Sequence, residues 1–239
     1  AGDERKYVYD YRDRLIKVTD RSDTTLAEYA YDGLNRRVKK DLPSGTDVRY
    51  LYNGWRSIQE VSLSSPDTVL ARYVYGPTYL DELIRMDREY EATPDGDIYE
   101  TGSFGYYFVQ DLTYNTVALV DDSGTVVERT WYEPYGKVTF ADSSGAAYQT
   151  QATLCGNEHL FTGQRYSAET RSSGNFGLYY CKMRYYDAAT GGFIGRDPAG
   201  YSGGTNPYEY VASRPTAGTD PYGLIIFLIH GIDNDDWYK

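Results

Sequence analysis

Two aspartates in matching turns could form an acid–base pair in this chain. The stretch from Gly195 to Leu224 reads GRDPAGYSGGTNPYEYVASRPTAGTDPYGL, and it opens and closes with Asp-Pro, one further residue and Gly. The aspartates are Asp197 and Asp220, and Arg196 directly precedes the first. Asp before Pro commonly begins a turn, because its carboxylate accepts backbone N–H groups while the Gly takes a positive φ. Two plain turns are therefore one interpretation.

The other interpretation is a working pair of carboxyl groups. Two carboxyls held close together cannot both ionise cheaply, so one keeps a proton while the other is charged. The charged group would activate water and the neutral one would protonate a departing amide, as in aspartic proteases, and the pair would titrate as a unit. Arg196 is a surface arginine in a turn unless it serves such a pair.

The composition favours the sheet that would have to position these groups. The chain has 239 residues, enough for one large or two small domains, and it contains 28 Tyr against 7 Phe, together with 24 Gly. Tyrosine favours pleated surfaces and keeps its hydroxyl wet or hydrogen-bonded when its ring is buried. Many tyrosines and glycines therefore predict extended sheet with frequent turns.

Charge, hydropathy and cysteine usage exclude several classes of protein. The net charge of −11 argues against a dominant nucleic-acid-binding surface, which needs clustered Lys and Arg. No run approaches the roughly 18 apolar residues of a transmembrane helix, and the charged start AGDERKYVYD is unlike a signal peptide. Cys155 and Cys181 could form one bridge or stay two unrelated thiols. With His159 and His230 they match no zinc spacing, so we expect no metal and no cofactor.

A repeated pattern of alternating aromatics runs through the first part of the chain. YVYDYRDRLIKVTD (Tyr7–Asp20) is echoed by AEYAYDGLNRRVKKDLPSG (Ala27–Gly45) and, less regularly, by RYLYNGWRSIQEV (Arg49–Val61). Period-two alternation between turn signals predicts strands joined as hairpins. A single hairpin cannot bury its own apolar face, so repeated hairpins must stack. We therefore predict a nearly all-β chain, in which the polar segment Asp87–Ser103 is an insertion between repeats.

These motifs carry a family resemblance. YAYDGLNRRV (Tyr29–Val38) resembles the YD repeat of Rhs proteins, teneurins and the C components of insecticidal Tc toxins. Four later motifs together resemble the Rhs repeat-associated core domain: FTGQRYSAET (Phe161–Thr170), GLYYCKMRYYDAATGGFIGRDPAG (Gly177–Gly200), NPYEYV (Asn206–Val211) and DPYGL (Asp220–Leu224). The resemblance covers nearly the whole chain up to Leu224.

The resemblance implies an architecture with three parts. In the family, YD hairpins form a long sheet that spirals into a hollow shell, the core domain plugs one end of it, and the chain continues inward into a variable C-terminal toxin. For this chain, that implies YD-repeat hairpins over residues 1–160 and a core domain with an autoprocessing motif over residues 161–224. Residues 225–239 would then begin the effector domain.

The resemblance also implies a reaction. Many family members cut the chain after the Leu of the last DPxGL, which here is the bond between Leu224 and Ile225. Asp197 and Asp220 would then be the catalytic pair. Arg196, which matches the family's Arg before the first Asp, would hold a carboxylate or polarise the scissile carbonyl, and proximity within one chain would replace a strong catalytic apparatus. Acid-labile Asp-Pro bonds are a different route, because they would break after either aspartate instead of after Leu224.

Three segments depart from the family pattern. RSSGNF (Arg171–Phe176) interrupts a usually continuous ETGLYY, GGF (Gly191–Phe193) lacks a common Arg, and SRP (Ser213–Pro215) replaces an Asn-rich pair before Pro. None of them touches the two aspartates or Arg196. The departures therefore bear on local turns more than on the chemistry.

The resulting functional hypothesis is a shell segment of a secreted or cell-surface polymorphic toxin that processes itself. Its partners would be its own C-terminal toxin, the upstream shell repeats and secretion-machinery components. The alternative is a non-enzymatic, teneurin-like extracellular module, in which Trp55 and Trp131 could bind glycans, or an inert scaffold. The tail IIFLIHGIDNDDWYK (Ile225–Lys239) resembles the first strand and His-Gly of an α/β-hydrolase, but no G-x-S-x-G follows it.

Overall fold

The computed structural model describes residues 4–43, 45, 47–65, 68–92, 99–149, 152–172, 176–201, 204–224 and 227–228. Within these residues, one antiparallel sheet of twelve strands takes up the first part of the chain, and every strand pairs with the next in chain order. The strands are β1 (Lys6–Tyr9), β2 (Leu15–Thr19), β3 (Thr25–Tyr31), β4 (Arg37–Asp41), β5 (Val48–Asn53), β6 (Arg56–Ser62), β7 (Val69–Tyr75), β8 (Leu83–Ala92), β9 (Tyr99–Gln110), β10 (Thr116–Asp121), β11 (Val126–Tyr132) and β12 (Val138–Ala141). The predicted all-β series of hairpins is confirmed.

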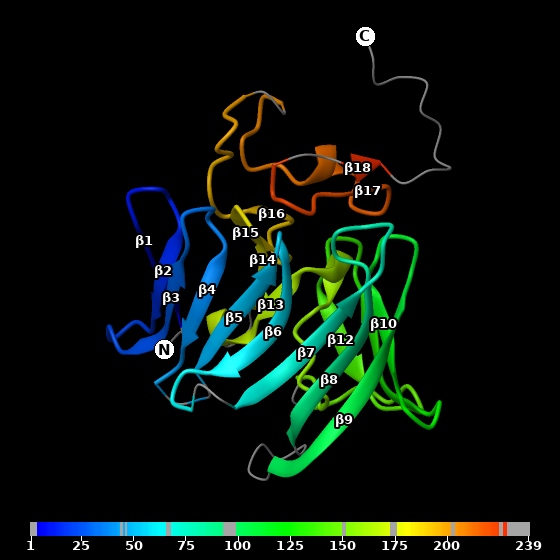
Figure 1. Ribbon diagram of the computed structural model, residues 1–239. Helices are drawn as coiled ribbons and strands as arrows, with labels where there is room; N and C mark the ends of the chain where they lie inside the picture. Colours follow the sequence, from blue (N-terminus) through cyan, green and yellow to red (C-terminus); the bar gives the residue numbers. More distant parts are fainter. Residues whose placement is uncertain are drawn as a thin grey trace.

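A smaller sheet lies on the concave side of the large one (Figure 1). It contains β13 (Arg165–Ser167), β14 (Leu178–Cys181), β15 (Arg184–Asp187) and β16 (Gly192–Phe193). A third, two-stranded sheet pairs β17 (Gly218–Thr219) with β18 (Phe227–Leu228). Short 3-10 turns span Phe161–Gly163, Ala168–Thr170 and Val211–Ser213.

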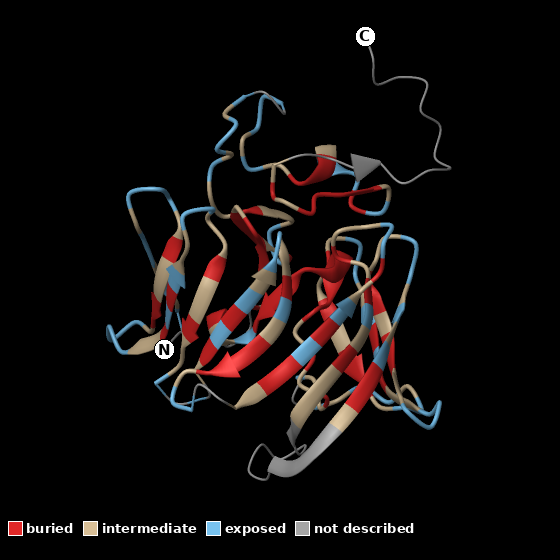
Figure 2. Ribbon diagram, in the orientation of Figure 1, coloured by how far each residue is buried: buried red, intermediate tan, exposed pale blue. Residues whose placement is uncertain are grey.

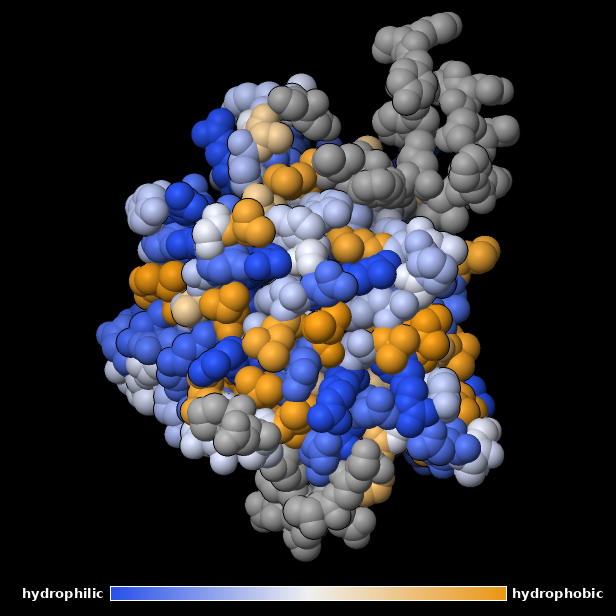
Figure 3. Space-filling view, viewed as in Figure 1, coloured by the Kyte–Doolittle hydropathy of each residue, from blue (hydrophilic) through white to orange (hydrophobic). Residues whose placement is uncertain are grey.

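The core fills the space between the two larger sheets. At one end, Leu15 and Tyr29 of the large sheet pack with Tyr180 and Tyr185 of the small one. At the other end, Phe140 of β12 belongs to a cluster with β14, β15 and β16. Buried and exposed residues alternate along strands such as β3 and β5 (Figure 2), as expected for a sheet with one covered face. The face seen in Figure 3 shows hydrophobic residues interspersed with hydrophilic ones.

The Tyr-Asp motif builds the same turn in successive hairpins. After β1, Asp10 Oδ1 accepts the N–H groups of Arg12 and Arg14 at 2.9 and 3.1 Å, and its Oδ2 pairs with the Arg14 guanidinium. Asp32 repeats this arrangement after β3, where Arg36 takes the place of Arg14. Asp at this position satisfies turn N–H groups that the strand ladder leaves unpaired.

Tyrosines near the ends of β3, β5, β7 and β11 bind the preceding strand. Tyr31 at the end of β3 donates its hydroxyl to the carbonyl of Leu15 at the start of β2, at 2.7 Å. The same bond recurs from Tyr52 to Arg37, from Tyr75 to Ser57 and from Tyr132 to Thr116, at 2.8, 3.1 and 2.7 Å. We call these four residues the strand-end tyrosines. Phenylalanine could not donate this bond, which accounts for part of the excess of Tyr over Phe.

The segment Asp87–Ser103 is not an insertion between repeats. Strands β8 and β9 run through it, and their pairing continues as far as Ala92 and Tyr99. Residues 93–98 lie outside the described part of the chain. The polar composition of the segment therefore belongs to a long hairpin arm, whose strands project beyond their neighbours (Figure 1).

Within the described residues, the chain has no helix long and apolar enough to cross a membrane.

Candidate functional site

The tight turn between β14 and β15 places an arginine at the centre of the site. Cys181 and Arg184 face each other in the ladder, so Lys182 and Met183 alone make the turn, with Lys182 at φ +60°. Arg184 is thereby fixed at the first position of β15, with its side chain only 4% exposed. Its guanidinium carbon lies 3.6 Å from the centre of the Phe193 ring.

Arg184 brings the two predicted aspartates together. Its Nη2 atom is 3.1 Å from Oδ2 of Asp197 and 3.6 Å from Oδ2 of Asp220. The aspartate side chains are 10% and 4% exposed. A guanidinium between two carboxylates offsets the electrostatic repulsion between their negative charges. Burial lowers the pKa of Arg184, and the two carboxylates oppose that shift.

Each aspartate also makes the turn that its Asp-Pro sequence predicts. Asp197 Oδ1 accepts the N–H of Ala199 at 2.8 Å, and Asp220 Oδ1 accepts the N–H of Leu224 at 2.9 Å. The Oδ1 atoms thus serve the turns, while the Oδ2 atoms face Arg184. The two interpretations of these residues are therefore compatible in one structure.

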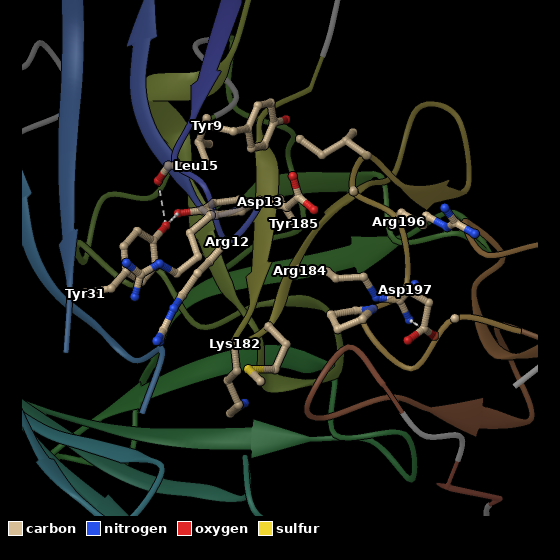
Figure 4. Close-up of a pocket in the computed structure, with 16 residues that line it drawn as sticks. Tyr9, Arg12, Asp13, Leu15, Tyr31, Lys182, Arg184, Tyr185, Arg196 and Asp197 are labelled. Carbon is tan, nitrogen blue, oxygen red and sulfur yellow. Dashed lines mark hydrogen bonds and ion pairs between the residues drawn. The ribbon is translucent and has the colours of Figure 1, made fainter. Parts of the chain in front are cut away.

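Arg196 occupies a different place from the one expected. It is exposed, its guanidinium carbon lies 5.3 Å from the centre of the Tyr201 ring, and it points away from the Arg184–Asp197 pair (Figure 4). Among the described contacts, Arg184 and not Arg196 meets the carboxylates. The missed residue lies in the MRYYD motif of the same sequence block. The family resemblance pointed to Arg196, whereas the hairpin turn makes Arg184 the spatial neighbour of both carboxylates.

The turn that ends at Leu224 is held against the β14–β15 turn. Met183 donates its N–H to the carbonyl of Tyr222 at 3.1 Å, and Arg184 Nε donates to the carbonyl of Gly223. Gly223 has φ +72°, and a Cβ there would lie 2.8 Å from the carbonyl oxygen of Cys181. Only glycine fits this close contact in that backbone conformation. Leu224 is half-buried, and Ile225 lies outside the described residues.

A cavity of about 320 Å³ lies beside the carboxylates (Figure 4). Asp197 and Arg184 line it from the core, and Arg12 and Asp13 of the β1–β2 turn line it from the large sheet. Asp220 is not among its lining residues. The two aspartates therefore differ in access to solvent, because Asp197 borders the cavity and Asp220 is enclosed.

The remaining sequence candidates occupy structural positions. Cys155 and Cys181 are both buried and are not joined by a disulfide, and burial raises the pKa of Cys181. His159 lies between the Gly163 carbonyl and the Arg165 guanidinium. The rings of Trp55 and Tyr222 pack edge to face, with 5.7 Å between their centres. Trp131 is 44% exposed.

His230 and the hydrolase-like tail lie outside the described residues. In the part of the chain that the structure covers, no group of three His, Cys, Asp or Glu side chains is arranged to hold a metal ion.

The curated relatives of this chain include proteins named as toxins. The RHS Repeat family model matches residues 9–47. Double-stranded DNA deaminase toxin A of Burkholderia cenocepacia is 30% identical over 94% of this chain and 16% of its own length. Toxin protein Tse5 of Pseudomonas aeruginosa is 28% identical over 95% of this chain and 18% of its own length. This chain thus spans less than a fifth of either relative.

Solved structures share the fold. The crystal structure of TcdB2–TccC3–Cdc42 matches with a TM-score of 0.68 and 21% identity, over 92% of this chain and 10% of that chain. The Photorhabdus luminescens Tc holotoxin pore matches with a TM-score of 0.62 and 20% identity, over 98% of this chain and 10% of that chain. The repeat match, the toxin relatives and the shared fold together show that this chain is a segment of an Rhs-repeat protein.

Proposed function

We propose that the chain is the C-terminal shell segment of an Rhs-type polymorphic toxin, which encloses a C-terminal effector and cleaves itself after Leu224. We assign the repeat shell to residues 1–160, the self-processing core to residues 161–224 and the start of the effector to residues 225–239. The partners would be the effector, the upstream repeats and components of a secretion machine, and the protein would act outside the cell or at its surface.

The convergence of Asp197 and Asp220 on Arg184 is the observation that carries this proposal. Two turns alone would need no arginine between them. Bringing three charged groups into a largely buried site costs desolvation that stability seldom repays, and such clusters gather at functional sites. Asp220 also binds the N–H of Leu224, the residue whose carbonyl carbon would be attacked.

The geometry supports a hydrolysis in which the residues have distinct positions. Water would reach Asp197 from the cavity that it borders, give up a proton to the carboxylate pair and add to the Leu224 carbonyl. The Ile225 nitrogen would take a proton as the bond breaks, leaving a Leu224 carboxylate and an Ile225 amine. Arg184 would hold the pair together and fix the Gly223 carbonyl, so that little reorganisation accompanies the reaction.

The names of the relatives support a shared role for this segment. They include a DNA deaminase toxin, a tRNA nuclease and a probable deoxyribonuclease, and each aligns with 93–96% of this chain but at most 16% of its own length. Activities that differ among these proteins are best assigned to parts outside the aligned segment. We infer that the segment performs a task common to all, namely enclosure and release.

The test is the intact mass of the 239-residue chain under denaturing conditions, beside Asp197→Asn and Asp220→Asn. The wild-type chain should break between Leu224 and Ile225, and both variants should stay whole. Asp142→Asn is the matched control, because Asp142 makes a similar turn after β12 and the described contacts place no arginine beside it. Breaks after Asp197 or Asp220 would indicate acid hydrolysis instead, and an uncut wild-type chain would refute self-cleavage.

A further inference from the structure

A buried ion pair joins the two larger sheets next to the carboxylate site. Lys182 Nζ lies 2.8 Å from both Oδ1 and Oδ2 of Asp81, and both side chains are 8% exposed. Lys182 belongs to the β14–β15 turn of the small sheet, and Asp81 belongs to the turn between β7 and β8 of the large one. The pair therefore fixes one turn against the other.

Gln164 extends the pair to the cleavage turn. Its Oε1 accepts from Lys182 Nζ at 3.2 Å, and its Nε2 donates to Asp81 Oδ2 at 2.9 Å and to the carbonyl of Pro221 at 3.4 Å. Burial raises the pKa of Asp81, while Lys182 and Gln164 act against that shift. Pro221 directly follows Asp220, so this network reaches the backbone of the proposed cleavage motif.

The turn that Lys182 anchors is the one that holds the site. Its neighbour Met183 binds the Tyr222 carbonyl, and Arg184 binds the Gly223 carbonyl and both aspartates. Any shift of the β14–β15 turn would therefore move the guanidinium and the cleavage turn relative to the large sheet.

We propose that Asp81 and Lys182 form a positioning latch, which sets Arg184 and the 220–224 turn in place only when the core is seated on the large sheet. The latch makes self-cleavage conditional on docking of the two parts of the fold. This inference rests on the proposed self-cleavage. Neither latch residue meets Asp197 or Asp220 in the described contacts, so both act through Arg184 and the turn.

A latch and a merely stabilising ion pair make different predictions. Replacing a buried ion pair by apolar residues of similar size is often neutral or favourable for stability. A displacement of about 1 Å at a reacting centre can cost about 100-fold in rate. A latch therefore matters for the cleavage rate more than for the melting temperature.

The experiment compares two double variants of the 239-residue chain in a cell-free synthesis reaction, sampled over time for intact mass. The test variant is Asp81→Leu with Lys182→Met. The control is Lys40→Met with Glu158→Leu, which removes the ion pair between β4 and the segment before β13 together with the Glu158–Arg165 contact, and leaves Arg165 paired with Glu60. We expect the test variant to cut roughly 10 to 100 times more slowly with a melting temperature within about 4 °C of wild type, and the control to cut at the wild-type rate.

Two further variants complete the test. Lys182→Arg keeps the charge and the reach to Asp81, so it should retain most of the cleavage. Gln164→Met keeps the ion pair but removes the contact with Pro221, and it should slow cleavage even if the test variant does not fold.

The outcomes separate the latch from the cleavage itself. A folded test variant that cuts at the wild-type rate, while Asp220→Asn stays whole, would overturn the latch and leave the proposed function standing. Equal slowing in the control variant would also overturn it, because loss of any ion pair would then suffice. An uncut wild-type chain would overturn both proposals.

Discussion

The large sheet and the core differ in how far their polar contacts reach along the chain. In the repeat hairpins of the large sheet, Asp10 binds Arg14 in its own turn, and Tyr52 donates to the carbonyl of Arg37 in the neighbouring strand. In the core, Arg184 pairs with Asp197 and Asp220, which lie in two later turns. Lys182 pairs with Asp81 in the β7–β8 turn of the large sheet. The first region is built from local rules repeated many times. The second depends on one arrangement of distant segments, so single changes there should have larger effects on function.

The largest expected effect is at the arginine that joins the distant turns. Arg184→Leu leaves Asp197 and Asp220 without the charge between them, and a buried charge without its partner is strongly unfavourable. We expect no detectable cleavage, measured as intact mass. Arg36→Leu removes the equivalent partner of Asp32 in a repeat turn, and the cut should persist. Equal loss in both variants would remove the distinction between the two regions.

Glu128 is a residue of the large sheet with a distant partner, so it sharpens the comparison. It lies in β11, is 1% exposed, and accepts from the Thr153 hydroxyl at 2.9 Å and the Leu154 N–H at 2.7 Å. Burial raises its pKa to about 7. The folded chain therefore binds this proton more tightly than the unfolded chain, and stability increases as the pH falls from 8 through 7 towards the ordinary glutamate range.

Replacing Glu128 by the neutral amide should remove that pH dependence. In Glu128→Gln the amide oxygen can still accept from Leu154, and the amide nitrogen can donate to Thr153. We expect the free energy of unfolding at pH 8 to rise by roughly 1 to 3 kcal/mol, with little change at pH 5, measured by urea unfolding. Glu133→Gln, at an exposed glutamate, is the control. A variant less stable than wild type at pH 8 would contradict the argument.

The smallest expected effect concerns a strained segment of the core. Val211, Ala212 and Ser213 all have positive φ, at +41°, +51° and +59°. Left-handed backbone costs non-glycine residues roughly 1–2 kcal/mol each. Replacing such a residue by glycine removes this cost, but the larger conformational entropy of glycine in the unfolded chain cancels part of the benefit. Ala212→Gly should stabilise the chain by about 0.5–1 kcal/mol. Ala217→Gly, where φ is not positive, should destabilise it in the same urea experiment.

Local patterns were enough to predict the large sheet. Alternating aromatics and Asp-containing turns predicted its hairpins, because pairing between consecutive strands needs only neighbouring residues. The polar arm from Asp87 to Ser103 was wrongly interpreted, since composition outweighed the strand pairing that continues through it. The SRP departure at Ser213 coincides with an unusual backbone. Asparagine tolerates the left-handed conformation better than most residues, and Ser213 adopts that conformation here without it.

The site was only partly accessible from sequence. The paired motifs pointed to Asp197 and Asp220, and the structure brings both to one guanidinium. Arg184 was missed because its role depends on a two-residue turn and on the packing of three segments. No local pattern encodes that convergence. The same limit applies to Asp81, which lies far from the core in sequence.

The hydrogen bonds of the strand-end tyrosines also favour the correct register between neighbouring strands. A slip of one residue between two strands turns every side chain to the opposite face, and it would carry the hydroxyl of Tyr52 away from the Arg37 carbonyl. Domains generally fold N-terminal first during synthesis. Each hairpin can thus be aligned against its predecessor during synthesis, and the segment with Asp197 and Asp220 is made only after the twelve strands against which the core packs.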